Sequence, residues 1–270
     1  MNLWQALLLG LVQGLTEFIP VSSSGHLELV EYLFNFQADN FHIFLECINL
    51  GTLLALLIYF RRRIWKILCD IFRERNYRLA INLVITTIPA GLAGLLLGEL
   101  ISENPFFSSI ITVCAAMGIV GLLMMVIDYL PHLKSLRNED QLTPVRALII
   151  GILQVFALIP GTSRSGTTII AGRLMGLDSE SAAEYSFLAS IPIMGAVCLR
   201  LFLSDTSRAY LAANLSTLIP ANIVAFLVGL IALRFLLRYL KKPKSLQTFG
   251  RYRVIVACLV LGATLIFASL

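Results

Sequence analysis

Long apolar segments without a charged residue recur along the chain, and each is as long as a membrane-spanning helix. Four uncharged runs cover residues 79–98, 104–127, 209–233 and 254–270. Each reaches the roughly 17–25 residues that an α-helix needs to cross a bilayer. Two further apolar segments, 42–60 and 184–203, are also long enough to cross. We therefore predict an all-α polytopic membrane protein.

Two polar motifs interrupt the remaining apolar stretches, 1–34 and 147–176. Their sequences are Ile19-Pro-Val-Ser-Ser-Ser-Gly-His26 and Ile159-Pro-Gly-Thr-Ser-Arg-Ser-Gly166, and each follows an apolar run that begins near a glutamine. Polar backbone that breaks a helix at membrane depth is tolerated only where it is buried in protein or lines a cavity. The two motifs therefore predict the two halves of one site.

The distribution of lysine and arginine predicts the topology. Residues 1–60 contain neither, and three basic stretches follow at 61–78, 134–146 and 234–253. Loops rich in Lys and Arg stay on the cytoplasmic side of a membrane. We place all three basic stretches in the cytoplasm. The two apolar segments that carry a polar motif, 1–34 and 147–176, must then each begin and end on the same side of the membrane, as a hairpin broken at Pro20 or Pro160.

This arrangement divides a single integral membrane domain, residues 1–270, into two related halves. Each half, 1–127 and 147–270, is a re-entrant helical hairpin followed by three transmembrane helices, and residues 128–146 form a basic cytoplasmic linker. The odd number of crossings makes the two repeats inverted in topology. Inverted repeats with broken helices that meet at the midplane are a known membrane plan. The alternative is eight full spans, with the two prolines as ordinary kinks.

Composition supports a membrane protein and argues against a nucleic-acid partner. Hydrophobic residues make up 58% of the chain and charged residues 14%, against about 25% charged in a typical soluble domain. The formal net charge is +5, but the basic residues cluster at the ends of apolar segments, which is the positive-inside pattern. The five cysteines form no C-x-x-C pair and are expected to pack as small apolar side chains.

The second motif has the chemistry of an anion-binding loop. Gly161-Thr-Ser-Arg-Ser-Gly-Thr-Thr168 runs directly into an apolar helical segment, so its amides lie at the positive end of a helix dipole. Arg164 adds a planar fork that matches a phosphate group. The candidate phosphate ligands of this motif are Gly161, Ser163, Ser165, Gly166 and Thr168. A nucleotide-binding P-loop is excluded, because Thr167 stands where the lysine belongs and no strand precedes the motif.

The first motif supplies acid–base and nucleophilic groups. Gln13 and Glu17 are four residues apart and therefore share a helix face. His26 follows across the Pro20 break, with serines before it. A carboxylate and an imidazole beside an anion-binding loop suit general acid–base catalysis, nucleophilic catalysis or binding of a divalent metal. The pattern leaves open whether His26, Ser23 or a water molecule is the nucleophile.

Three elements of the sequence closely resemble the undecaprenyl-diphosphate phosphatases, the bacterial bacitracin-resistance family that recycles the cell-wall lipid carrier. They are Gln13-x-x-x-Glu17, the run 20–26 and the run 160–168, and the resemblance extends over nearly the whole chain. It implies hydrolysis of the terminal phosphate of undecaprenyl diphosphate in the bacterial inner membrane. It also implies a divalent cation, Mg²⁺ or Ca²⁺, and a site reached from the periplasmic face.

The chemistry of the two motifs, taken with this resemblance, gives the expected role of each residue. The expected catalytic residues are Glu17, Ser23, His26 and Arg164. Ser22 and Ser24 join the phosphate-binding residues of the second motif. The family allows Glu or Gln at the first position of its first motif, so Glu17 is the expected acid and metal ligand here, with Gln13 as a second candidate ligand.

Two other functions are compatible with the sequence. Inverted repeats with broken helices also occur in transporters, so a lipid-phosphate flippase or an anion transporter is the main alternative. A membrane serine hydrolase using Ser23 and His26 is a weaker one, because Arg164 would then have no evident task. The expected partners are undecaprenyl diphosphate and membrane lipid, and the oligomeric state, a homodimer included, stays open.

Overall fold

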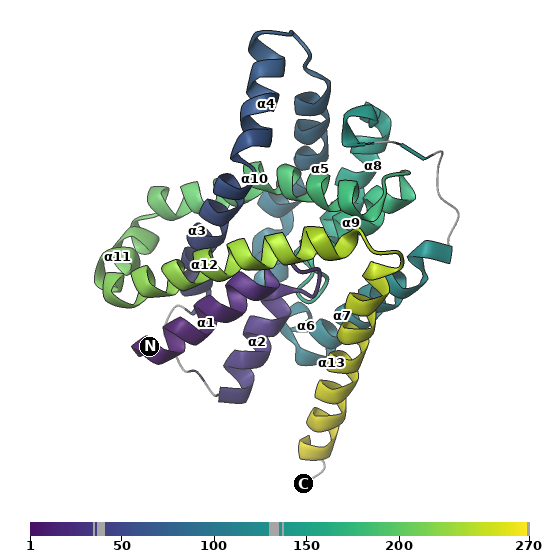
Figure 1. Cartoon of the computed structure of the whole chain (residues 1–270). Helices are drawn as coiled ribbons and strands as arrows, with labels where there is room; N and C mark the ends of the chain where they lie inside the picture. The colour runs from purple at the N-terminus through teal and green to yellow at the C-terminus, as the bar shows by residue number, and fades with distance from the viewer. Residues whose placement is uncertain (35, 37–40, 130–134, 137, 269–270) are drawn as a thin grey trace.

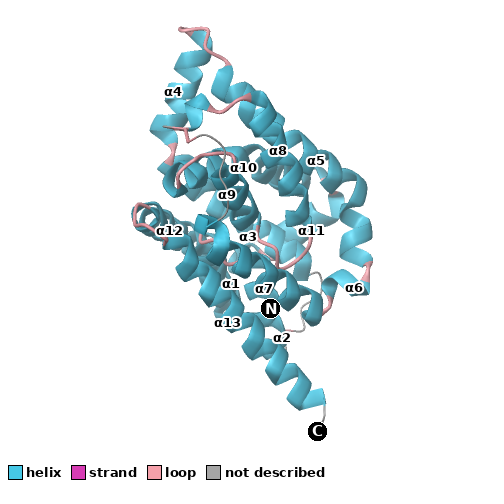
Figure 2. Cartoon of the chain, turned by 90° about the vertical axis from the view of Figure 1, so that its right-hand side faces the viewer, coloured by secondary structure: helices cyan, strands magenta, loops and turns pink. Residues whose placement is uncertain are grey.

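The computed structural model describes residues 1–34, 36, 41–129, 135–136 and 138–268, and in this part of the chain all regular secondary structure is helical (Figure 1 and Figure 2). Lys134 and Arg137 of the expected basic linker lie outside the described residues. The elements up to the linker are α1 (Leu3–Thr16), α2 (Ser23–Phe34), α3 (Phe41–Tyr59), α4 (Arg61–Phe72), α5 (Arg78–Glu103), α6 (Pro105–Ser108), α7 (Ile110–Val126) and η1 (Ile127–Tyr129). Those that follow are η2 (Glu139–Gln141), α8 (Pro144–Gln154), η3 (Val155–Leu158), α9 (Arg164–Leu174), α10 (Ser179–Leu203), α11 (Asp205–Ala213), α12 (Leu215–Leu240) and α13 (Ser245–Ala268).

Among the described residues, six helices are long and apolar enough to cross a membrane, namely α3, α5, α7, α10, α12 and α13. They confirm the six spans predicted from the apolar segments. The last helix begins earlier than the predicted span 254–270, because α13 begins at Ser245 and includes Arg251 and Arg253 of the third basic stretch. Arg253 is buried inside the protein, where backbone carbonyl groups take the place of water around its guanidinium.

Two shorter apolar helices, α1 and α8, precede the polar motifs. They have 14 and 11 residues, fewer than the roughly 20 that a span requires. After α1, and after the short turn η3 that continues α8, the chain leaves helical geometry and then starts a new helix, α2 or α9. These lengths agree with the expected hairpins, while the direction in which each half crosses the membrane stays a prediction.

The two halves of the chain interlock. α1 packs along α12 and α8 packs along α5, so the first helix of each half lies against a long helix of the other (Figure 1). Both contacts are close at a glycine: a Cβ on Gly10 would lie 2.4 Å from the Ala221 carbonyl oxygen, and one on Gly151 would lie 2.6 Å from that of Thr86. Small residues let transmembrane helices approach in this way. Neither half could make these contacts without the other.

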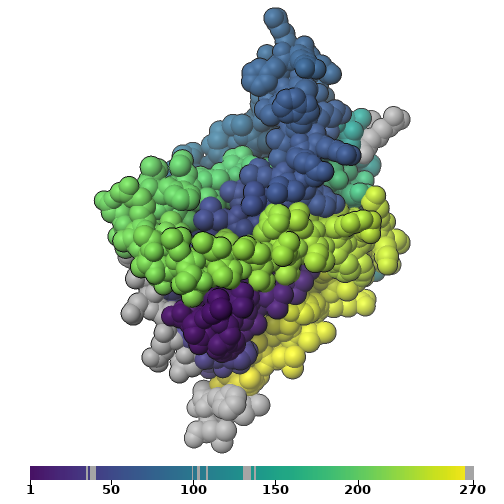
Figure 3. Space-filling view, turned by 60° about the vertical axis from the view of Figure 1, so that its left-hand side comes forward, coloured from purple at the N-terminus to yellow at the C-terminus, as the bar shows by residue number. Residues whose placement is uncertain are grey.

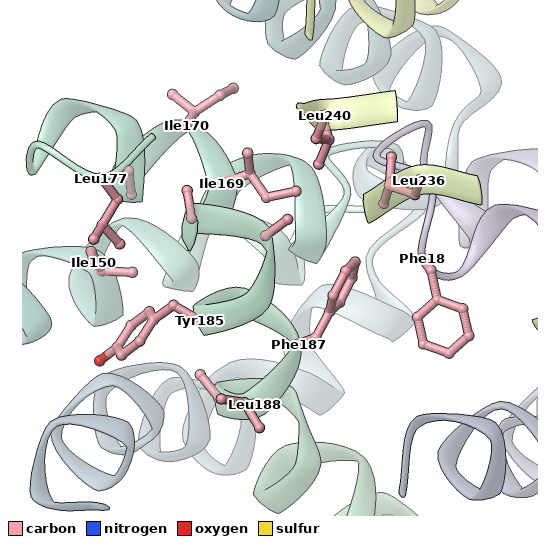
Figure 4. Close-up of a cluster of buried hydrophobic side chains, with 14 of the residues drawn as sticks. Phe18, Ile150, Ile169, Ile170, Leu177, Tyr185, Phe187, Leu188, Leu236 and Leu240 are labelled. Atoms are coloured by element: carbon pink, nitrogen blue, oxygen red, sulfur yellow. The ribbon is translucent and has the colours of Figure 1, made fainter. Parts of the chain in front are cut away.

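The largest buried hydrophobic cluster also takes residues from both halves (Figure 4). Phe18 reaches into it from the end of α1, and its ring meets that of Phe187 on α10 edge to face, with centroids 5.7 Å apart. Such a pair stabilises a protein by about 0.5–1.5 kcal/mol beyond the contribution from burying the two rings. Because Phe18 directly follows Glu17, this contact anchors the start of the first polar motif. On the surface, α12 and α1 lie side by side, with α13 on the same face of the molecule (Figure 3).

Candidate active site

The two polar motifs adopt the same local backbone. Ser22 and Ser163 have left-handed φ angles of 77° and 74°, which residues other than glycine rarely adopt. Each serine precedes the first residue of a helix, and its Oγ accepts a hydrogen bond from the amide three residues on, Gly25 at 3.3 Å and Gly166 at 3.2 Å. These caps satisfy one free amide at each helix start. Strained serines of this kind, at about 1–3 kcal/mol each, cluster at functional sites.

The shared geometry relates the two motifs with a spacing of 141 positions. The same spacing relates Gln13 to Gln154, and it pairs Ser23 with Arg164 as the first residues of α2 and α9. Alignment of the motifs on their prolines would pair Arg164 with Ser24 instead. The second loop therefore has one residue more than the first between its proline and its capping serine.

Glu17 lies at the centre of the site and connects the two short helices. Its Oε1 accepts a hydrogen bond from Arg164 Nη2 at 2.6 Å, and its Oε2 accepts one from Ser23 Oγ at 2.7 Å. Gln13 Nε2 donates to the same Oε2 at 3.1 Å. The side chains of Glu17 and Arg164 are only 11% and 17% exposed, so their ion pair is largely withdrawn from solvent. One carboxylate thus binds the first residue of both α2 and α9.

A cavity of about 240 Å³ adjoins this carboxylate. Its polar lining comes mainly from both motifs and consists of Gln13, Glu17, Ser23, Ser24, Asn49, Ser163, Arg164 and Ser165. Asn49 of α3 is a residue that the sequence candidates omit, and its Oδ1 accepts a hydrogen bond from Gln13 Nε2 at 2.7 Å. The sequence signal for it is a polar amide within an otherwise apolar span, because polar side chains at membrane depth usually serve function.

One of the two terminal nitrogens of Arg164 is available to a ligand. Its Nη2 binds Glu17 and lies 3.6 Å from Met194 Sδ. Its Nη1 is buried and has no hydrogen-bond partner among the described residues. A buried donor without a partner costs about 1–3 kcal/mol, so an anionic oxygen at Nη1 would stabilise this arrangement. Arg164 also begins α9, and the free amides at the start of a helix attract anions. The cavity therefore has the properties of a phosphate-binding site.

Four of the expected phosphate ligands shape the loops and do not themselves line the cavity, namely Ser22, Gly161, Gly166 and Thr168. Ser22 and Gly166 belong to the two caps. Gly161 has a φ of +86°, and a Cβ on it would lie 2.3 Å from the Val113 carbonyl oxygen. Thr168 donates to the Arg164 carbonyl oxygen at 2.8 Å and also bonds the Ser186 hydroxyl of α10.

His26 is oriented toward α13. Its Nδ1 lies 2.7 Å from the Ser22 carbonyl oxygen, and its Nε2 lies 2.8 Å from the Tyr252 hydroxyl. The imidazole also stacks on the Tyr252 ring, with centroids 5.6 Å apart. Both ring nitrogens are therefore engaged, and the imidazole is not part of the cavity lining. The structure brings Glu17, Ser23 and Arg164 together and places His26 outside that group.

Comparison with known proteins identifies the family. The sequence profile described as bacitracin resistance protein BacA matches residues 6–259, which include both polar motifs. The chain belongs to this family. It is 38% identical to the undecaprenyl-diphosphatase of Marinobacter nauticus, over 95% of this chain and 97% of that protein. The undecaprenyl-diphosphatases of Neisseria meningitidis serogroup C and Nitrosomonas europaea are 37% and 36% identical, over 93% and 96% of this chain and 91% and 93% of those proteins.

Membership of the BacA family confirms the resemblance drawn from the three sequence elements. Together with the six apolar helices in the described part of the chain, it makes the protein a multi-pass protein of the bacterial inner membrane. The BacA match runs from α1 into α13. It therefore includes Tyr252 and Arg253, which contact the polar motifs and which the sequence candidates omit.

Proposed function

We propose that this BacA-family protein hydrolyses undecaprenyl diphosphate to undecaprenyl phosphate and inorganic phosphate. This reaction recycles the cell-wall lipid carrier and confers bacitracin resistance. The observation that carries the proposal is the shared carboxylate, since Glu17 binds both a serine hydroxyl and an arginine beside a polar cavity. Phosphoryl transfer needs an activated nucleophile and cationic groups that neutralise the transferred phosphate. The curated relatives are named for the same activity.

In the proposed reaction Ser23 is the nucleophile. Its Oγ attacks the terminal phosphorus while its proton passes to Glu17, 2.7 Å away. The bond from that phosphorus to the bridging oxygen breaks, and undecaprenyl phosphate leaves with the electron pair and receives the proton from Glu17. Water then attacks the phosphorus of the phosphoserine and gives a proton to Glu17. The bond from phosphorus to Ser23 Oγ breaks, Oγ takes the proton from Glu17, and inorganic phosphate is released. Arg164 and the first amides of α9 stabilise the negative charge on the transferred group.

His26 has a supporting role in this proposal. Its ring connects the first turn of α2 to Tyr252 of α13, because the two ring nitrogens face the Ser22 carbonyl and the Tyr252 hydroxyl. A nucleophilic histidine would need a free nitrogen directed at the phosphate. Ser23, by contrast, lines the cavity and already has a base within hydrogen-bonding distance. We therefore expect a phosphoserine and no phosphohistidine.

A divalent cation, Mg²⁺ or Ca²⁺, is proposed to bind together with the diphosphate. The described residues contain no group of three or more His, Cys, Asp or Glu side chains that could hold a metal. The cavity offers one carboxylate, Glu17, and the amide side chains of Gln13 and Asn49. These hard oxygen donors fit Mg²⁺, which is commonly held by one or two carboxylates and substrate phosphates. When bound, the cation would neutralise charge on the diphosphate oxygens.

The isoprenyl tail is proposed to lie in an apolar groove of about 510 Å³ that is lined mainly by α7 and α9, with further residues from α6, α8 and η3. Thr162 and Thr167 of the second motif line this groove, whereas Ser163 and Arg164 line the polar cavity. One loop thus adjoins a polar space and an apolar space. Groove residues such as Ile119 are largely exposed on the protein surface. An amphiphilic substrate could therefore place its diphosphate in the cavity and its tail toward the lipid.

Access from the periplasmic side is part of the proposal. Residues 1–60, which include α1, α2 and α3, contain no Lys or Arg, whereas α4 begins with three arginines. The positive-inside rule therefore favours a cytoplasmic α4 and a first hairpin that enters from outside. Undecaprenyl diphosphate and membrane lipid are the proposed partners.

Release of inorganic phosphate by the purified protein tests this function. Protein in detergent, supplied with undecaprenyl diphosphate labelled in its terminal phosphate, should release the label. Arg164→Ala should elute as a folded protein and release none. A lipid-phosphate flippase or an anion transporter would leave the substrate intact, so a purified wild-type protein that binds the lipid and releases no phosphate would overturn the proposal.

A further inference from the structure

Arg253 of α13 is fully buried and binds only backbone carbonyl oxygens. Its Nε donates to Met117 at 3.1 Å and its Nη1 to Pro20 at 3.2 Å. Its Nη2 donates to Gly161 at 2.8 Å and to Thr162 at 3.0 Å. Its exposed fraction is 0%. Within the described part of the chain, no carboxylate forms an ion pair with this guanidinium.

These hydrogen bonds connect both polar motifs to one side chain. Pro20 lies three residues before Ser23, and Thr162 lies two residues before Arg164. Arg253 therefore binds the backbone of each loop just before the short helix that carries an active-site residue. Because the loops belong to opposite halves of the chain, the guanidinium fixes the position of one half relative to the other.

Arginine suits this position better than any other residue. A buried charge is costly unless hydrogen bonds satisfy it, and a guanidinium offers five donors in a fixed plane, whereas an ammonium offers three at one point. The backbone of α13 is also held firmly here, since a Cβ on Gly250 would lie 2.5 Å from the Gly121 carbonyl oxygen of α7. Because the backbone at Arg253 is fixed, the positions of its Nη1 and Nη2 atoms determine where the two loops lie.

We propose that Arg253 is a positioning residue that sets the spacing between the two polar loops and thereby brings Ser23 and Arg164 to the same carboxylate. The inference rests on the proposed function of these two residues. Arg253 does not line the cavity, so it acts through the backbone of the loops. Misplacement of a reacting group by about 1 Å costs on the order of 10²-fold in rate. Loss of the hydrogen bonds from Arg253 to the two loops therefore lowers kcat more than it weakens substrate binding.

Arg253→Lys tests this role, with Arg251→Lys as the matched control. Both changes keep the charge on α13, and Arg251 is exposed. In Arg253→Lys, kcat should fall at least about tenfold, while KM for undecaprenyl diphosphate changes little and gel filtration shows a folded protein. Arg251→Lys should behave as the wild type. Arg253→Gln, which avoids an unsatisfied buried charge, should show the same split between kcat and KM.

A double-mutant cycle separates positioning from a general structural effect. In a Ser23→Ala background there is no nucleophile left to align, so Arg253→Lys should reduce the residual rate by less than about twofold. Equal fractional losses in both backgrounds would overturn the proposal, as would unchanged kcat in Arg253→Lys or misfolding of both Arg253 variants. If Ser23→Ala alone keeps full activity, the proposed nucleophile is wrong, and the kcat of Arg253→Lys still decides whether Arg253 positions the loops.

Discussion

Ser23 and Arg164 occupy the same position in two short helices, and Glu17 binds both of them. Each is the first helical residue after a left-handed serine, at 2.7 Å and 2.6 Å from the carboxylate oxygens. A hydroxyl and a guanidinium thus stand at equivalent points of the two motifs. The acid has no counterpart, because the spacing that pairs Ser23 with Arg164 pairs Glu17 with Leu158. The two halves therefore contribute different groups to one site.

Replacement of Ser23 tests its proposed role as the nucleophile. Ser23→Ala should lower kcat by at least about 10³-fold, the scale seen when a nucleophile is removed. Ser24→Ala should lose less, about tenfold or below, because Ser24 lines the cavity but its hydroxyl bonds that of Ser22, and the described residues show no hydrogen bond from it to Glu17. Rapid quenching with labelled substrate should trap an acid-stable phosphoserine in the wild type. An acid-labile phosphohistidine would instead assign the attack to His26.

Replacement of Arg164 by lysine tests the value of the guanidinium fork. Arg164→Lys keeps the charge but cannot bind Glu17 and a phosphate oxygen through two nitrogens at once. Its kcat should fall about 10²-fold, the usual cost of one oxyanion-stabilising donor. Arg173→Lys on the same helix is the control, since Arg173 pairs with Asp128 away from the cavity. A phosphate-release assay in which both variants lose activity equally would contradict the special role of Arg164.

The six spans could be predicted because the bilayer imposes one length on every crossing helix. The uncharged run 79–98 lies within α5, which extends five residues beyond its end. The uncharged run 209–233 overlaps most of α12, which begins six residues later and ends seven residues later than the run. The polar motifs were equally evident, because serine-rich loops have few other uses at membrane depth. Which residues face the cavity did not follow from the motifs, since helix caps and cavity lining draw on the same residue types.

Arg253 shows where charge counting fails. A basic residue near the start of an apolar segment has the same sequence signature whether it faces the cytoplasm or lies inside the protein. Its partners are carbonyl groups of Met117, Pro20, Gly161 and Thr162. Any residue carries a carbonyl, so no sequence pattern marks these partners. The contact between His26 and Tyr252 is hidden for a related reason, since 226 positions separate the two residues.

Addition of a second carboxylate tests the proposed cation. Gln13 lies 3.1 Å from Glu17 and borders the cavity, so Gln13→Glu places two acids side by side. More ligand charge tightens divalent-cation binding, and the concentration of Mg²⁺ or Ca²⁺ that gives half-maximal phosphate release should fall about three- to tenfold. The measurement is a metal titration of both proteins after removal of metal by a chelator. An unchanged half-maximal concentration would place the cation elsewhere.

The close contact of α1 with α12 predicts a stability effect that does not involve catalysis. A methyl group at Gly10 would lie 2.4 Å from the Ala221 carbonyl oxygen, so Gly10→Ala should destabilise the protein by about 1–3 kcal/mol. Gly91→Ala on α5 is the control, because nothing lies within 4 Å of a Cβ built there. Thermal unfolding in detergent should show a lower midpoint for Gly10→Ala alone. Equal midpoints would mean that α1 can shift on α12 without cost.

Obstruction of the apolar groove tests where the isoprenyl tail binds. Ala116 of α7 lines the groove of about 510 Å³ beside the second motif, and Ala116→Trp would fill much of it. For undecaprenyl diphosphate, kcat/KM should fall about tenfold, because a buried apolar tail loses roughly 0.8 kcal/mol for each CH₂ returned to a less favourable environment. A short, water-soluble isoprenyl diphosphate, with little tail to place, should be hydrolysed by this variant nearly as fast as by the wild type.

A second apolar groove supplies the matched control for this test. It has a volume of about 330 Å³, and its lining includes Ile219 of α12 together with residues of α3 and α11. None of its lining residues belongs to the polar motifs, so Ile219→Trp should leave kcat/KM unchanged for both substrates. The opposite pattern, in which Ile219→Trp impairs the long substrate and Ala116→Trp does not, would move the tail to the second groove. Equal loss on the short substrate in Ala116→Trp would instead mean that the tryptophan distorts the Arg164 loop.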